Sequence, residues 1–176
     1  MKRGEKGFTT IEVLVALAIV ALITGGAAMS TVQIIQGAER TSDHMIAIRH
    51  AQSVGYWLSN DAMIARNIDI GDNPETGDDE FITVYWKNWE NGDTHEIRYI
   101  WLDSSGGLKK LNRNHVTRNK DGVETDNRTA FVADNIYTAS LSEQDGGWRL
   151  NVEARSGAKS ETREYEISKR IEFEEW

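Results

Sequence analysis

The chain of 176 residues has no cysteine and only one proline, Pro74. Without cysteine, disulfide scaffolds, thiolate zinc sites and thiol nucleophiles are excluded. An excess of basic residues is also missing, because 20 lysines and arginines face 28 acidic residues and the net charge is −8. This balance disfavours a nucleic-acid-binding protein. The length suits one domain with an appendage and is too short for two full domains.

Apolar residues are concentrated at one end of the chain. Between Phe8 and Ala38 the only charged side chain is Glu12. As a helix, residues 8–29 would measure about 33 Å, enough to cross a bilayer core of about 30 Å. The residues before this stretch form a positive flank that would stay in the cytoplasm, so the rest of the chain would face outward. The basic residues of this flank are Lys2, Arg3 and Lys6.

Three interpretations fit such a segment: a cleaved secretory signal, a plain membrane anchor, or a processed segment with a function of its own. The first two leave Glu12 unexplained. An ionisable side chain at membrane depth costs about 3 kcal/mol on insertion scales and usually has a functional reason. The third interpretation is therefore favoured.

The stretch from Lys6 to Leu14, Lys-Gly-Phe-Thr-Thr-Ile-Glu-Val-Leu, resembles the class III signal of type IV pilins and type II secretion pseudopilins. The resemblance implies that a prepilin peptidase cuts between Gly7 and Phe8 and methylates the new amine of Phe8. Glu12 then becomes the fifth residue of the mature chain. It also implies that Glu12 of an incoming subunit pairs with the Phe8 amine of a neighbour, an attraction that is strong in low dielectric.

The same resemblance implies partners and a location. The partners are the prepilin peptidase, other major and minor pseudopilins, an inner-membrane assembly platform and the lipid bilayer, with no nucleic acid. The chain would cross the inner membrane once, with its globular part on the periplasmic side, and would enter a fibre after cleavage. The expected activity is mechanical and not enzymatic, and no nucleophile elbow, phosphate loop or dinucleotide fingerprint occurs in the sequence.

Helical periodicity continues beyond the apolar segment. Small and aliphatic residues recur at spacings of four and three, which predicts one face of a helix that packs closely on a sheet. These residues are Ala47, Ala51, Val54, Leu58, Ala62 and Ala65, and polar residues including Arg49, Gln52, Asn60, Asp61 and Arg66 are expected on the remaining surface. The helix is expected to run from about Phe8 to about Asn67, before Gly71 and Pro74.

The C-terminal part alternates between apolar and polar residues, which predicts about six antiparallel strands. The expected strands include residues 81–86, 97–102, 136–141, 148–155 and 165–173, with turns at 104–107 and 145–147. The predicted fold class is α+β, a long helix packed on an antiparallel sheet. The predicted organisation is a leader at 1–7, a transmembrane helix at 8–30, its amphipathic continuation at 31–70 and a β-rich head at 71–176.

The order of segments in the head resembles the J-type minor pseudopilin of type II secretion. The features concerned are the hairpin arm Leu108–Arg113, the segment Phe131–Ile136 and the Asp-Gly-Gly-Trp sequence that starts at Asp145. W-type minor pilins of type IV pili share much of this layout, so a minor subunit of a type IV pilus is the alternative. Retention of Glu12 argues against the K-type tip subunit, which typically lacks this residue.

No metal site is expected, with one weak alternative. Calcium prefers carboxylate oxygens, and two loops are acidic, although neither matches an EF-hand. The loops are Asp69–Glu80, with Asp72, Glu75, Asp78, Asp79 and Glu80, and Asp121–Asp126. We expect surface roles for the histidines, His44, His50, His95 and His115, and core positions for the tryptophans of the first strands, Trp86, Trp89 and Trp101, with an exposed ligand-binding cluster as the alternative.

Overall fold

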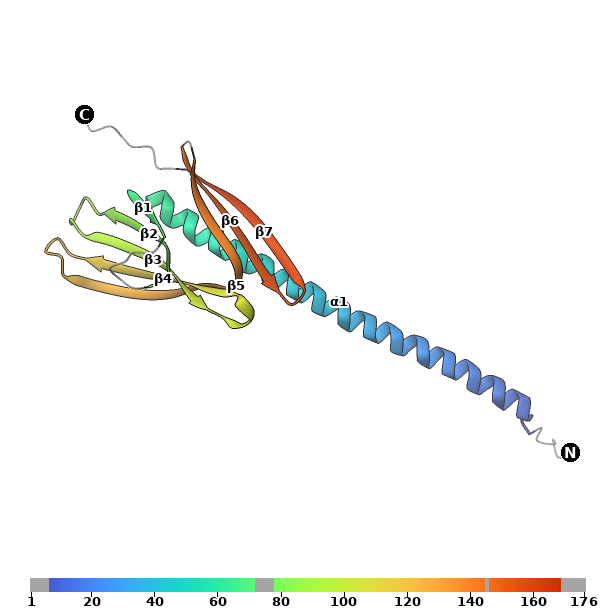
Figure 1. The fold of residues 1–176 in the computed structure, drawn as a ribbon. Helices are drawn as coiled ribbons and strands as arrows, with labels where there is room; N and C mark the ends of the chain where they lie inside the picture. Colours follow the sequence, from blue (N-terminus) through green and yellow to red (C-terminus); the bar gives the residue numbers. More distant parts are fainter. Residues whose placement is uncertain (1–6, 72–77, 145, 169–176) are drawn as a thin grey trace. The chain divides into compact units, whose positions relative to one another are not determined.

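The computed structural model describes residues 7–71, 78–144 and 146–168, and the chain divides into two compact units, Met1–Thr41 and Ser42–Trp176. One helix, α1 (Thr10–Ile64), runs through both. The second unit, called the head unit below, combines the last part of α1 with one antiparallel sheet (Figure 1). The predicted α+β, pilin-like fold is confirmed.

Among the described residues the sheet has seven strands in sequence order, so that each strand pairs with the one before it. The strands are β1 (Asn67–Ile70), β2 (Glu80–Lys87), β3 (Thr94–Asp103), β4 (Lys109–Arg118), β5 (Glu124–Gln144), β6 (Gly147–Ser156) and β7 (Lys159–Ser168). The six pairings between these described strands are all antiparallel, the arrangement in which consecutive strands can be joined by a tight turn. The predicted turn at 104–107 is confirmed, with Gly106 and Gly107 at φ of 71° and 76°. Residues 169–173 of the last predicted strand lie outside the described residues.

The predicted apolar face of the helix is confirmed from Ala47 to Ala62, whereas Ala65 lies after the end of α1 and is half-buried. Ala47, Ala51, Val54 and Leu58 are fully buried, and Ala62 is 2% exposed. They pack on alternate residues of the central strands, among them Ile82, Val84, Ile97, Leu111, Leu150 and Val152. The apolar face predicted for the helix thus belongs to the same core as the inner face of the sheet.

The helix ends earlier than predicted. We expected it to continue to about Asn67 and its amphipathic part to reach residue 70, but α1 ends at Ile64 and Asn67–Ile70 form β1. The backbone N–H of Arg66 donates to the carbonyl of Tyr85 at 2.8 Å, and β1 then pairs with β2. Pairing with a strand distant in sequence thus ends the helix, which local periodicity does not reveal.

Asp61 corrects a second expectation. We placed this side chain on the polar surface of the helix, but it is only 5% exposed. Its Oδ2 accepts hydrogen bonds from Tyr99 Oη at 2.5 Å and Arg113 Nε at 2.6 Å, and its Oδ1 accepts one from Arg113 Nη2 at 3.0 Å. The guanidinium of Arg113 also lies 5.2 Å from the ring centroid of Trp57. The network ties the helix to β3 and β4.

The network also fixes the protonation states of its members. Burial raises the pKa of Tyr99, and the negative charge of Asp61 raises it further, so the phenol stays neutral and donates. Burial alone would lower the pKa of Arg113, but its hydrogen bonds and ion pair with Asp61 outweigh that effect and raise it. Arg113 therefore stays positively charged and maintains its ion pair with Asp61.

Strand β5 bends between two partners. Its first part pairs with β4 and its second part with β6, and the register breaks near residues 133–136. Asn135 has a φ of 57°, the left-handed region that asparagine tolerates better than most residues. Side chains of the helix bind the backbone at this bend: Ser53 Oγ donates to the carbonyl of Val132 at 2.6 Å, and His50 Nδ1 accepts from the N–H of Asp134 at 3.1 Å. The first part of β5 is mostly polar and exposed, which is why its sequence did not predict a strand.

Candidate functional site

The helix begins with a reciprocal cap made by Thr9 and Glu12. The hydroxyl of Thr9 accepts the backbone N–H of Glu12 at 3.3 Å, and the carboxylate Oε2 of Glu12 accepts the backbone N–H and the hydroxyl of Thr9, each at 2.9 Å. This arrangement is a capping box, with threonine at the N-cap and glutamate three residues later. The sequence Thr-Thr-Ile-Glu contains the signal for it, although we interpreted Glu12 only through its charge.

The cap places the carboxylate of Glu12 beside the residues that we predict to be processed. Because Glu12 folds back to the N–H of Thr9, its negative charge lies at the positive end of the helix. Phe8 is 87% exposed, and no atom lies within 4 Å of a Cβ built on Gly7. The predicted cleavage site and the predicted assembly carboxylate therefore lie together at the start of α1, with the peptide bond between Gly7 and Phe8 uncovered by the described residues.

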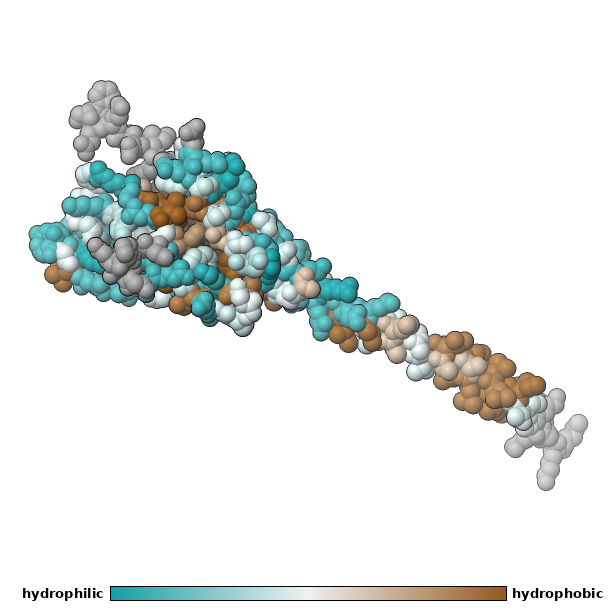
Figure 2. Space-filling model, viewed as in Figure 1, coloured by the Kyte–Doolittle hydropathy of each residue, from teal (hydrophilic) through white to brown (hydrophobic). Residues whose placement is uncertain are grey.

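The helix that follows is long and apolar enough to cross a membrane, and none of that stretch is buried within the protein. In Figure 2 this part of α1 is almost entirely hydrophobic. Three of its hydroxyls are satisfied within the helix: Thr24, Ser30 and Thr31 each donate to the carbonyl four residues earlier, at 2.8–3.0 Å. No hydroxyl of these three needs a partner from the lipid, as a spanning helix requires.

Comparison with known proteins identifies the same segment. Residues 2–28 match the family model described as the prokaryotic N-terminal methylation motif. No curated protein and no solved structure matches the chain.

The motif, the membrane-length helix and the sheet together support a type IV pilin-like protein. A class III signal implies processing by a prepilin peptidase and pilin-like assembly into fibres, and it suggests a structural subunit. The signal and the apolar helix also fit membrane anchoring.

The acidic loops do not gather into a metal site among the described residues, where no group of three or more histidine or acidic side chains is placed to hold an ion. Asp78 and Glu80 lie 3.5 and 3.6 Å from the guanidinium of Arg98, and Asp79 lies 3.1 Å from Lys109 Nζ. In the second loop, Asp126 pairs with Arg128 at 2.8 Å. Asp72 and Glu75 lie outside the described residues.

The three tryptophans have different environments. Trp86 and Trp101 are half-buried and pack on the core, as expected, with the ring of Trp101 5.1 Å from that of Phe81. Trp89 is 83% exposed in the turn after β2, which corrects its predicted core position. The guanidinium of Arg66 lies 6.0 Å from its ring centroid. An exposed cluster of all three is not formed.

Only His44 has the exposed surface position that we expected of the histidines. Burial lowers the pKa of His50, which agrees with its role as an acceptor at the bend of β5. His95 and His115 are half-buried and contact each other, with Nδ1 of His95 3.2 Å from Nε2 of His115. Burial lowers the pKa of His115, and the positive charge of Arg113 lowers it further. The surface roles that we expected of His95 and His115 are therefore wrong, because the two rings are half-buried against each other.

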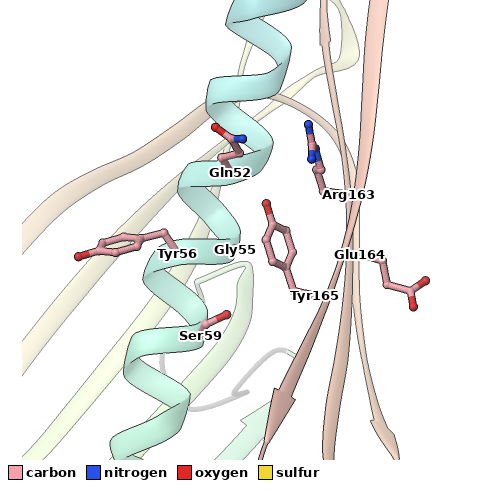
Figure 3. A pocket seen from close by; sticks show the side chains of 7 residues that line it. All are labelled: Gln52, Gly55, Tyr56, Ser59, Arg163, Glu164 and Tyr165. Carbon is pink, nitrogen blue, oxygen red and sulfur yellow. The ribbon is translucent and has the colours of Figure 1, made fainter.

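A shallow groove lies between the helix and the edge strand β7 (Figure 3). The ring of Tyr165 points from β7 to the helix at Gly55, and its hydroxyl donates to the carbonyl of Ala51 at 3.3 Å. A Cβ built on Gly55 would overlap this ring. Glycine at position 55 therefore allows β7 to approach the helix.

Replacing Gly55 by alanine should lower the free energy of unfolding of the head unit by about 1–3 kcal/mol, because overpacking forces the ring or the strand to move. Urea unfolding of the full chain in detergent micelles, followed by tryptophan fluorescence, measures the loss. Gly37→Ala is the matched control, since no atom lies within 4 Å of a Cβ there. In a Tyr165→Ala variant the ring is absent, so Gly55→Ala should cost much less stability there than in the wild type. If Gly55→Ala lowers the free energy of unfolding of the Tyr165→Ala variant as much as that of the wild type, or more, the explanation is contradicted.

Proposed function

We propose that the protein is a minor pseudopilin-like subunit that helps to initiate or cap a short periplasmic pseudopilus for protein export by a type II secretion system. It is inserted into the inner membrane once, by the first part of α1, with the head unit on the periplasmic side. A prepilin peptidase cuts between Gly7 and Phe8 and methylates the amine of Phe8, after which the subunit enters the fibre.

The observation that carries this proposal is the methylation motif at residues 2–28, which contains the start of a membrane-length helix. The position of Glu12 adds a physical reason. After cleavage the chain would begin with an ammonium group at Phe8, one helical turn from a carboxylate already oriented to the N-terminal end of the helix. A neighbour's ammonium group neutralises that carboxylate in an apolar environment, where an unpaired charge is costly.

The assignment to secretion rests on the order of segments in the head unit, which resembles a J-type minor pseudopilin. The alternative is a minor pilin of a type IV pilus, which serves assembly, adhesion or DNA uptake. The net charge of −8 disfavours direct binding of DNA by this subunit.

Co-expression with a prepilin peptidase tests the processing step. Mass spectrometry should find a mature chain that starts at Phe8 and carries one additional methyl group, and a Gly7→Val variant should keep its leader because the branched side chain obstructs the cut. A mature N-terminus at any other residue would contradict the proposal. Gly4→Val, in the leader but away from the cut, is the control.

Deletion of the gene in its native host separates the two fibres. A pseudopilin predicts that exported enzymes accumulate in the periplasm while surface pili and twitching motility are unchanged. Loss of pili, adhesion or DNA uptake with normal secretion would replace the proposal with the alternative.

A further inference from the structure

His95 and His115 lie on one face of the sheet in adjacent strands, next to Trp86. His95 is directly opposite Trp86 of β2 and Thr117 of β4, and His115 is two residues from Thr117 along β4. The ring of Trp86 stacks on His95, with centroids 4.7 Å apart and planes at 7°, and on His115 at 5.6 Å and 30°. This face is the one that carries Tyr99 and packs on the helix farther along the strands.

From this arrangement we propose that His95 and His115 bind one divalent transition-metal ion of the Zn²⁺, Ni²⁺ or Cu²⁺ class, through His95 Nδ1 and His115 Nε2. Imidazole nitrogens are ligands that these ions prefer, whereas Ca²⁺ and Mg²⁺ prefer oxygen. Water completes the coordination, because the chain supplies two nitrogen ligands. This site is independent of the proposed function in fibre assembly.

The separation of the two nitrogens supports a shared ion. They lie 3.2 Å apart. Two nitrogens bound to one ion at about 2.0–2.1 Å lie about 2.9 Å apart at a right angle and about 3.3 Å apart at the tetrahedral angle. The observed distance falls in that interval, so the two nitrogens can share an ion once the rings turn from each other toward it.

The polar surroundings fit the same site. Thr117 Oγ1 lies 3.2 Å from His95 Nδ1. This nitrogen therefore has two polar neighbours, the hydroxyl of Thr117 and Nε2 of His115. Without a metal, the N–H of one ring donates a hydrogen bond to the nitrogen of the other. The donating ring can instead adopt its other neutral tautomer, with the proton on its second nitrogen, which frees the first nitrogen to bind an ion. Binding then needs no net loss of a proton from a neutral pair.

Nearby positive charges are already paired. Arg113 is bound to Asp61, and Arg128, which is opposite His115 in β5, forms an ion pair with Asp126 at 2.8 Å. Both histidines are half-buried, so an ion reaches them from solvent while Trp86 covers one side of the pair.

The stacked tryptophan also provides an optical reporter, because bound Cu²⁺ or Ni²⁺ quenches an indole in contact with its ligands.

Titration of the tag-free full chain in detergent micelles with ZnCl₂, NiCl₂, CuCl₂ and CaCl₂ tests the site. We expect saturable binding of one Zn²⁺, Ni²⁺ or Cu²⁺ per chain and none of Ca²⁺. His95→Gln and His115→Gln should each weaken the affinity by at least about 10-fold, since even residues that only support a metal ligand cost that much when replaced. His44→Gln, an exposed histidine on the helix, should leave it unchanged, and Trp86→Phe should abolish most of the quenching without changing the affinity for Zn²⁺ by isothermal titration calorimetry.

A second measurement uses the unaltered protein, so it does not depend on the folding of any variant. In NMR spectra of the wild type with ¹⁵N-labelled histidine, Zn²⁺ should shift the ring signals of His95 and His115 and not those of His44 and His50. The proposal is overturned if no binding saturates, if His95→Gln and His115→Gln bind as tightly as the wild type, or if Zn²⁺ shifts only the other two histidines.

Discussion

Asp61→Ala should lower the free energy of unfolding of the head unit by about 3–5 kcal/mol, the range for removing one partner of a buried ion pair. The substitution leaves the guanidinium of Arg113 and the hydroxyl of Tyr99 without their acceptor in the interior. Such a loss is a large fraction of the stability of a typical domain, which is about 5–15 kcal/mol. Urea unfolding of the full chain in micelles, followed by tryptophan fluorescence, gives the value.

Two further variants separate the cause from a general loss of charge. Asp103→Ala removes an exposed carboxylate at the end of β3 and should change the unfolding free energy by less than about 0.5 kcal/mol. The triple variant Asp61→Leu, Tyr99→Phe and Arg113→Met replaces the ion pair and the hydroxyl bound to it by apolar groups. It should recover most of the stability, because such replacements are often neutral. A loss below about 1 kcal/mol in Asp61→Ala would show that the network contributes little.

Glu12→Gln should leave cleavage between Gly7 and Phe8 intact and prevent entry of the subunit into the fibre. Glutamine preserves the capping box with Thr9 and removes only the negative charge. Loss of one partner of a buried ion pair costs about 3–5 kcal/mol, which corresponds to a more than about 100-fold weaker association. A photoreactive group placed at Ile34, in the exposed part of α1, reports contacts with any neighbouring subunit in the fibre by crosslinking.

The cap and the charge can be tested separately. Thr9→Val removes the hydroxyl of the capping box and retains the carboxylate of Glu12, at an expected cost of about 1 kcal/mol to the first turn of the helix. If the charge matters for assembly, Thr9→Val subunits enter the fibre and Glu12→Gln subunits do not. Normal entry of the Glu12→Gln subunit would rule out the proposed pairing with the amine of Phe8.

Three residues of the helix, His50, Ser53 and Gly55, have structural roles where the sheet meets it. Gly55 lets Tyr165 lie against the helix, and His50 and Ser53 bind the backbone where β5 changes partner. Where a sheet bends, some backbone groups lose their hydrogen-bond partners in the neighbouring strand, and here side chains of the helix take the place of those partners. These positions are therefore predicted to tolerate substitution poorly although they have no role in processing or membrane insertion.

The sequence alone determined whatever depends on neighbours along the chain. A helix or a strand displays local patterns whatever it packs against. These patterns are the apolar run interrupted only by Glu12, the spacing of Gly7, Phe8 and Glu12, the apolar face from Ala47 to Ala62, and the alternation in β2, β3 and β6. They were enough to predict the α+β fold and the N-terminal motif. Even Asp61 follows the spacing of the apolar face, three residues after Leu58 and four before Ala65, so its burial had a local signal that its charge concealed.

Tertiary structure decided what depends on residues far apart in sequence. Strand β1 forms because β2 offers it partners, and the network of Asp61 requires Tyr99 and Arg113 to arrive 38 and 52 residues later. The contact of His95 with His115 likewise depends on the register of two strands, and a shift of one residue would move either ring to the opposite face. Register is set by the whole sheet and its helix together, which is why no stretch of the chain, read by itself, predicts these contacts.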